Sequence, residues 1–169
     1  MKSLLPLLLL CAGAACAQSN SDYALNDGKV RFHVPSGWTA IMEKSDGNPQ
    51  AIVFQVPDPA TSGTDDAATI TVKTRQLKSP ADFAEAVQNE LVLSKAQTGY
   101  ESDANPSDNG VHRYFVMRGN TRYAIRDRFV LIGSVAAQVR CQRPLLDATS
   151  KEWTTAWDSG CNSVAASVQ

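Results

Sequence analysis

The sequence of 169 residues has few of the residue types from which catalytic and metal centres are built. It contains only two histidines, His33 and His112, and it lacks the GxSxG, HExxH, GxGxxG and phosphate-binding-loop patterns. A catalytic triad needs a base beside its nucleophile, and a zinc site needs three or four His or Cys ligands. We therefore expect no cofactor, no metal centre and no enzymatic activity. A hydrolase with an unrecognised site is kept as a further interpretation.

The sequence also lacks an excess of one charge and a long apolar run. It has 16 Lys+Arg against 17 Asp+Glu, a net charge of −1, which argues against a nucleic-acid binder. No stretch approaches the roughly 18 apolar residues that span a bilayer, so no transmembrane segment is predicted. With 43% hydrophobic residues, the length suffices for one globular domain with its own core.

The N-terminus has the three-part layout of a secretory signal peptide. Lys2 gives a positive start, Leu4–Ala12 is apolar apart from one proline, and small residues follow to Ala17. We expect cleavage after Ala17, which divides the chain into a signal peptide, 1–17, and a single domain, 18–169, exported to the periplasm. A lipoprotein acylated at Cys16 stays open as an alternative, although the leucine usual three positions before the cysteine is missing.

Cleavage would leave two of the four cysteines, Cys141 and Cys161. An exported chain with two cysteines most simply pairs them. The bridge would close a loop of about 20 residues, worth roughly 3 kcal/mol in the chain-entropy model. A redox or metal role would need a CxxC spacing or nearby histidines, and the sequence offers neither.

Hydrophobic periodicity predicts both strands and helices. Apolar and polar residues alternate as in half-buried strands at 30–34, 39–43, 51–56, 68–75, 111–118, 121–132 and 135–141. The period changes after Ser79, where Phe83, Val87 and Leu91 recur every four residues before Gly99, so we expect a helix of about 18 residues. The polar segment 101–110 is predicted to be a loop; its carboxylates and amides could bind calcium, but it lacks EF-hand spacing.

A second helix is predicted at the C-terminus. Thr149 and Glu152 match a capping box, and Trp153, Trp157 and Cys161 fall on one helical face. Because the two tryptophans share the buried stripe of Cys161, we expect them to be core residues and not a platform for a ligand. The predicted fold class is α+β, an antiparallel sheet of about six to seven strands flanked by two main helices in an α/β/α or two-layer sandwich.

The nonapeptide Val30–Trp38, VRFHVPSGW, resembles the opening strand of the PsbP-like family, in which a strand ends in a Pro-x-Gly-Trp turn. The long central helix, the late hairpins and the terminal helix also resemble that family, over most of residues 22–167. The family includes the extrinsic protein of photosystem II and mycobacterial exported lipoproteins. The resemblance implies a PsbP-like α/β/α sandwich that binds other proteins, and it implies no catalytic residue.

Seven arginines crowd into positions 113–143, where Asp127 is the only acid. If Gly119-Asn120 and Gly133-Ser134 are two-residue turns, counting sets the register of the three strands. His112, Asp127 and Arg140 then form a row on one face, and four arginines share the other face: Arg113, Arg122, Arg126 and Arg128.

Like charges that face each other across strands are destabilising, so these arginines either extend into solvent or meet an acidic surface. The first interpretation is a solvated sheet edge. The second makes the four arginines a docking face for another protein with an acidic surface, with Arg126 and Arg128 both directed outward and dispensable for folding.

Together these expectations describe an exported, non-enzymatic protein-binding module. Small size, export and one disulfide suggest an inhibitor or immunity protein that acts against an exported toxin or lytic enzyme. The alternative is an assembly or structural accessory of the cell envelope.

Overall fold

The computed structural model describes residues 20–104 and 110–169. The expected signal peptide, including Cys16, lies outside the described residues, as does the middle of the polar loop at 105–109. Within the described ranges, no helix is both long enough and apolar enough to cross a membrane.

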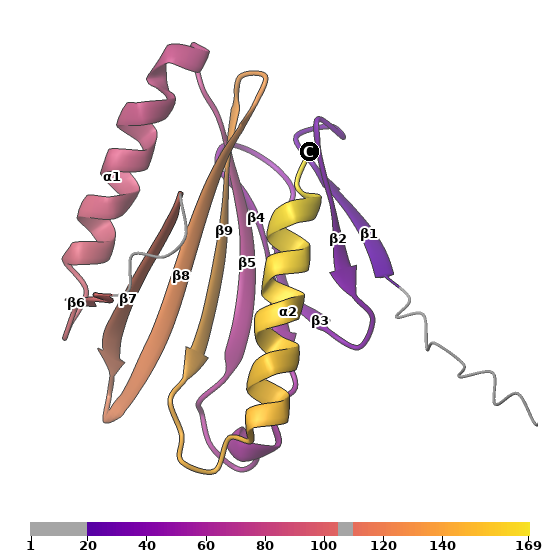
Figure 1. Ribbon diagram of the computed structural model, residues 1–169. Helices are drawn as coiled ribbons and strands as arrows, with labels where there is room; N and C mark the ends of the chain where they lie inside the picture. Colours follow the sequence, from indigo (N-terminus) through magenta and orange to yellow (C-terminus); the bar gives the residue numbers. More distant parts are fainter. Residues whose placement is uncertain (1–19, 105–109) are drawn as a thin grey trace, which may run out of the picture.

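The fold is α+β, as predicted, with a seven-stranded antiparallel sheet at its centre (Figure 1). The strand order is β3-β4-β5-β9-β8-β7-β6, and β1 and β2 form a separate two-stranded hairpin. The strands are β1 (Asn20–Leu25), β2 (Val30–Pro35), β3 (Thr39–Lys44), β4 (Gln50–Val56), β5 (Ala68–Gln76), β6 (Glu101–Ser102), β7 (Val111–Arg118), β8 (Thr121–Ile132) and β9 (Val135–Pro144).

Two of these strands were not predicted. In β1 only Leu25 is buried, so the strand carries no apolar alternation that could reveal it. Strand β6 is two residues long and interrupts the segment predicted as a loop, where Glu101 pairs with Phe115 and Ser102 with Tyr114.

The register of β7, β8 and β9 follows the two predicted turns. Gly119 and Gly133 both have positive φ, of 56° and 58°, a conformation that glycine adopts without steric cost. Arg113 lies opposite Arg126, and Asp127 lies between its partners on the neighbouring strands, His112 and Arg140. The predicted cross-strand row is therefore confirmed.

The two faces of the sheet are covered differently. The face that carries Cys141, here called the α2 face, is covered by the β1–β2 hairpin and by helix α2 (Lys151–Ser167), which packs on β2 and β9. Phe32 of the hairpin meets Phe54 of β4 edge to face, with ring centroids 6.2 Å apart. In Figure 1, β8 and β7 extend beyond the edge of α2. The opposite face, here called the α1 face, is covered by helix α1 (Phe83–Lys95).

Helix α1 is shorter than predicted, with 13 residues. A single 3₁₀ turn, Pro80–Asp82, precedes it, and Ser79 caps that turn as expected. The helix ends at Lys95 because the chain then turns to pair with β7, where the amide of Met117 donates to the carbonyl of Thr98. A Cβ at Gly99 would lie 2.5 Å from the Met117 side chain, so this close approach needs glycine.

The cap of α2 differs from the prediction by one residue. Ser150, and not Thr149, is the N-cap, and its hydroxyl accepts from the amide of Trp153. The predicted capping box of Thr149 with Glu152 is therefore wrong. The Thr149 hydroxyl instead donates to Asp58, which ties the start of the helix to the loop after β4.

The predicted disulfide is present and joins α2 to the sheet. Cys141 of β9 and Cys161 of α2 are both buried, and their Cα atoms are 6.2 Å apart. On the same helix Gly160 provides a second close contact, because a Cβ there would lie 2.5 Å and 2.6 Å from two ring carbons of Trp38. The indole of Trp38, which ends the Pro-x-Gly-Trp turn, therefore packs directly on the helix backbone.

We expect Gly160→Ala to lower the free energy of unfolding by about 1–3 kcal/mol, because the added methyl overpacks the contact with Trp38. Helix propensity alone predicts the opposite, a gain of about 1 kcal/mol. Urea unfolding of the variant and the native protein distinguishes the loss expected from overpacking from the gain expected from helix propensity. In a Trp38→Leu background the substitution should become neutral or stabilising, and a penalty that persists there would contradict the packing argument.

Cys141→Ser should lower the free energy of unfolding by about 2–4 kcal/mol, because the loop of about 20 residues is no longer closed in the unfolded chain. Alkylation should then label Cys161 in the variant. If both thiols of the oxidised native protein react with the reagent, the bridge is not formed in solution.

Candidate functional site: the arginine face

Five arginines lie together on the α2 face, at and beyond the edge of the helix. Four of them are the arginines predicted to share one face, and the register places them there from β7 and β8. Arg143 joins them from β9, opposite Ala124. We call this set the arginine face: Arg113, Arg122, Arg126, Arg128 and Arg143.

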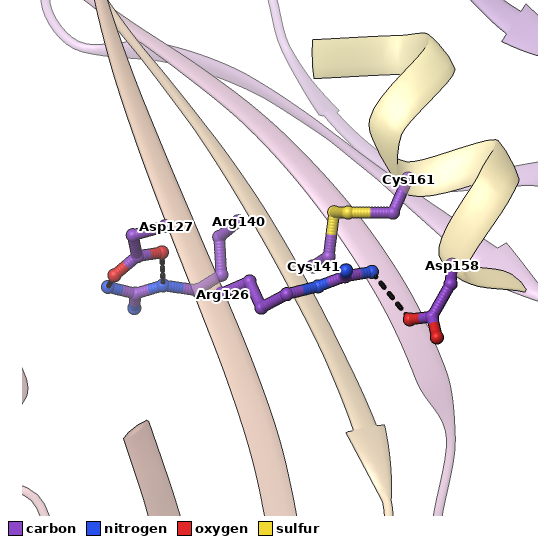
Figure 2. Close-up of a disulfide and its surroundings, with 6 residues drawn as sticks. All are labelled: Arg126, Asp127, Arg140, Cys141, Asp158 and Cys161. Atoms are coloured by element: carbon purple, nitrogen blue, oxygen red, sulfur yellow. Dashed lines mark hydrogen bonds and ion pairs between the residues drawn. A yellow bond between two sulfur atoms is a disulfide. The ribbon is translucent and has the colours of Figure 1, made fainter. Parts of the chain in front are cut away.

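Arg122 and Arg126 are held by carboxylates and aromatic rings of the same chain. The Arg122 guanidinium donates to Glu101 at 2.7 Å and lies 4.1 Å from the ring centroid of Phe115. Arg126 pairs with Asp158 of α2 at 2.8 Å (Figure 2). Its guanidinium also lies 4.9 Å from the ring centroid of Trp157.

The expectation that Arg126 is directed into solvent is therefore wrong. Its side chain is only 13% exposed, because α2 lies over it and supplies both a carboxylate and an indole. The sequence could not reveal this contact, since the lateral position of α2 depends on tertiary packing.

Arg128 and Arg143 differ from these two. Arg128 is exposed, and among the described residues it takes part in no hydrogen bond or ion pair. Arg143 lies 5.7 Å from the ring centroid of Trp157 and likewise has no carboxylate partner in the described part of the chain. These two cations carry positive charge that the fold does not neutralise.

A groove of about 220 Å³ runs through the arginine face. Ala124 lies at its base, and Phe115 and Trp157 supply aromatic walls. Asp103 and Asp158 also line it, together with Arg113, Arg126 and Arg143. Five arginines thus face three carboxylates, counting Glu101, so the site is cationic and fits a ligand that carries negative charge.

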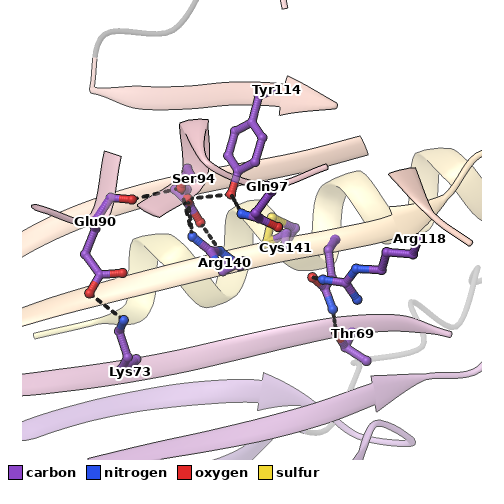
Figure 3. Close-up of polar contacts among 12 residues, drawn as sticks. Thr69, Lys73, Glu90, Ser94, Gln97, Tyr114, Arg118, Arg140 and Cys141 are labelled. Carbon is purple, nitrogen blue, oxygen red and sulfur yellow. Dashed lines mark hydrogen bonds and ion pairs between the residues drawn. A yellow bond between two sulfur atoms is a disulfide. The ribbon is translucent and has the colours of Figure 1, made fainter. Parts of the chain in front are cut away.

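The α1 face of the same strands carries a buried polar cluster instead. Asp127 is fully buried and accepts two hydrogen bonds from Arg140, at 2.7 Å and 2.8 Å, and a third from the Tyr114 hydroxyl at 3.2 Å. Ser94 of α1 contacts Arg140 at 3.3 Å (Figure 3). Figure 2 shows Arg126 and Asp127, adjacent in β8, directed to opposite sides of the sheet.

The electrostatics of this cluster fit a structural role. Burial lowers the pKa of the Arg140 guanidinium, but hydrogen bonds and charge attraction from Asp127 outweigh that effect and raise it above its ordinary value. Burial lowers the pKa of His112, with partial compensation from Asp127, so the ring is held neutral beside Tyr114. Sequence analysis found the row but missed Tyr114 and Ser94, which reach Asp127 and Arg140 only in the folded protein.

Within residues 20–104 and 110–169, no group of three or more His, Cys, Asp or Glu side chains could hold a metal ion. The calcium interpretation of the loop before Gly110 falls mainly on positions outside the described residues.

Comparison with known proteins gives a likeness of fold. No family model matches the sequence, and no curated protein matches it. Among solved structures, LpqN of Mycobacterium tuberculosis, described as involved in cell envelope biogenesis, superposes with a TM-score of 0.52 at 14% identity, over 90% of this chain and 91% of LpqN. A protein of Bacteroides thetaiotaomicron superposes with a TM-score of 0.53, also at 14% identity.

The alignment with the Bacteroides protein covers 88% of this chain but only 47% of that one, so this chain spans about half its length. At such low identity the two likenesses show the fold alone.

The two neighbouring arginines of β8 should respond differently to charge reversal. Arg126→Glu should lower the free energy of unfolding by about 2–3 kcal/mol, because it places a second carboxylate beside Asp158 under the helix. Arg128→Glu is the matched control on the exposed surface and should change stability by no more than about 0.5 kcal/mol. Urea unfolding measures both, and equal losses would contradict the different environments of the two side chains.

Proposed function

We propose that this protein is an exported, non-enzymatic binding module of PsbP-like architecture that docks an acidic surface of another envelope protein on its arginine face. In this role it serves as an assembly or structural accessory of the cell envelope. The observation that carries the proposal is the positive charge of Arg128 and Arg143, which has no counter-ion within the described fold.

The arrangement of the other arginines supports binding by a rigid surface. Arg122 and Arg126 are fixed by carboxylates and aromatic rings, so little side-chain entropy is lost when a partner docks beside them. Fixed cations flanked by aromatic side chains are also the residue types enriched at protein interfaces.

Three further observations support the envelope as the place of action. The N-terminal 17 residues match a signal peptide, and a disulfide joins Cys141 to Cys161, as is common in exported proteins. The structure of LpqN, a protein described as involved in cell envelope biogenesis, shares the fold over most of both chains. The same face could also serve an inhibitor or immunity protein, and the identity of the partner distinguishes the two roles.

The test is a double reversal, Arg128→Glu with Arg143→Glu, in the tagged protein of its own host, followed by cross-linking and purification from the envelope. We expect recovery of the specific partner to fall about tenfold or more, because repulsion replaces attraction at the docking surface. The control is Lys44→Glu with Lys151→Glu, which makes the same charge change on β3 and at the start of α2, and it should leave recovery unchanged.

An envelope complex lost only from the arginine variant supports the proposed role, whereas a toxin or lytic enzyme lost in the same way supports the inhibitor. If both variants recover the same partners as the native protein, the arginine face is not the docking site.

A further inference from the structure

A second groove lies on the other side of α2, between the helix and the link from β2 to β3. It encloses about 500 Å³, within the range of small-molecule sites. Three tryptophans line it: Trp38, Trp153 and Trp157. The remaining lining residues are small or neutral, and among them are Asn20, Gly160, Ser159 and Ser163.

The aromatic walls are held in place before any ligand binds. Trp38 packs on the helix at Gly160, as described above. The indole N–H of Trp153 donates to the carbonyl of Pro57 at 2.6 Å, and its ring stacks on Trp157 with centroids 6.3 Å apart. A preorganised wall of this kind reduces the entropy lost on binding.

The hydroxyl groups of α2 fall into two sets. Thr154, Thr155 and Ser167 donate to carbonyls of their own helix, the usual arrangement for such residues. Ser159 and Ser163, one turn apart and both on the groove, take part in no hydrogen bond with any described residue. Their hydroxyls can therefore donate to a ligand and accept from it.

None of the described residues that line the groove is charged, although 20% of the residues in the sequence are charged. A charged ligand would lose its hydration on entering the groove, and the lining has no opposite charge to replace that hydration. The lining therefore favours a neutral ligand. A purely apolar ligand would leave the serine hydroxyls and the Asn20 amide without partners.

We propose that this tryptophan groove binds a neutral saccharide. The C–H bonds on one face of a pyranose ring carry partial positive charge and meet the negative face of an indole, while the ring hydroxyls exchange hydrogen bonds with Ser159 and Ser163. The inference goes beyond the proposed function, because the groove lies on the other side of α2, shares only Trp157 with the groove of the arginine face, and takes a ligand without charge.

The test titrates the mature protein with two neutral trisaccharides, the N-acetylglucosamine trimer and maltotriose, and follows tryptophan fluorescence and calorimetric heat. Saturable binding of either one is expected. Ser163→Leu should weaken it by about tenfold or more, because leucine fills the groove where the serine left room. Ala166→Leu, an exposed position of the same helix outside the groove, should leave affinity unchanged.

Trp153→Ala gives an independent check if its melting shows that the domain still folds, and it should weaken the binding of the sugar measured by calorimetry, because Trp153 is one of the three aromatic walls. Arg128→Glu, which changes the arginine face and contacts no tryptophan of the groove, should bind the sugar as the native protein does, so the two proposals can fail separately. The saccharide proposal is overturned if neither sugar saturates the protein, if Ser163→Leu binds as tightly as native, or if a proline-rich peptide occupies the groove in place of sugar.

Discussion

The position of α2 across the sheet is the constraint on which both candidate sites depend. The helix is fixed by the disulfide at Cys161, by Trp38 packed on Gly160, and by the C-terminal Gln169, whose backbone exchanges two hydrogen bonds with Arg31 of β2. Trp157, which is 3% exposed, lines the grooves on both sides of the helix. A shift of α2 would therefore alter the wall of each groove together.

The arginines can stay crowded because the opposite face locks the register of their strands. A one-residue slip of β8 would move Asp127 away from Arg140 and leave a buried carboxylate without its partner, which typically costs about 3–5 kcal/mol. The same slip would carry Arg126 away from Asp158. The Asp127–Arg140 pair on the α1 face thus stabilises the strand register, and that register brings the mutually repelling arginines together on the α2 face.

Much of this could be predicted from the sequence, and the remainder depended on contacts between distant segments. Two glycine-containing turns were enough to predict the register of β7, β8 and β9, because a two-residue turn fixes which residues of the two flanking strands lie opposite each other. The disulfide followed from the cysteine count. Counting could place Arg126 on a face, but it could not place Asp158 and Trp157 above it, since no local pattern sets where a helix lies across a sheet. The tryptophan groove was not predicted for the same reason, because Trp38 and Gly160 are 122 positions apart. Trp153 and Trp157 were expected to be core residues; Trp157 is buried, whereas Trp153 is only partly buried and lines the groove.

The arginines differ in role because only some of them lie beside a carboxylate of the fold. Arg126 lies under the helix, where Asp158 neutralises it, and its burial makes it part of the fold. Arg128 lies two residues further along β8, beyond that carboxylate, and keeps its charge in solvent. A charge in solvent attracts a partner from a distance and orients it, whereas an internally paired charge offers a fixed hydrogen-bonding surface at contact. A cationic face that acts in binding therefore uses both kinds, and substitution of the exposed Arg128 tests recognition without also testing folding.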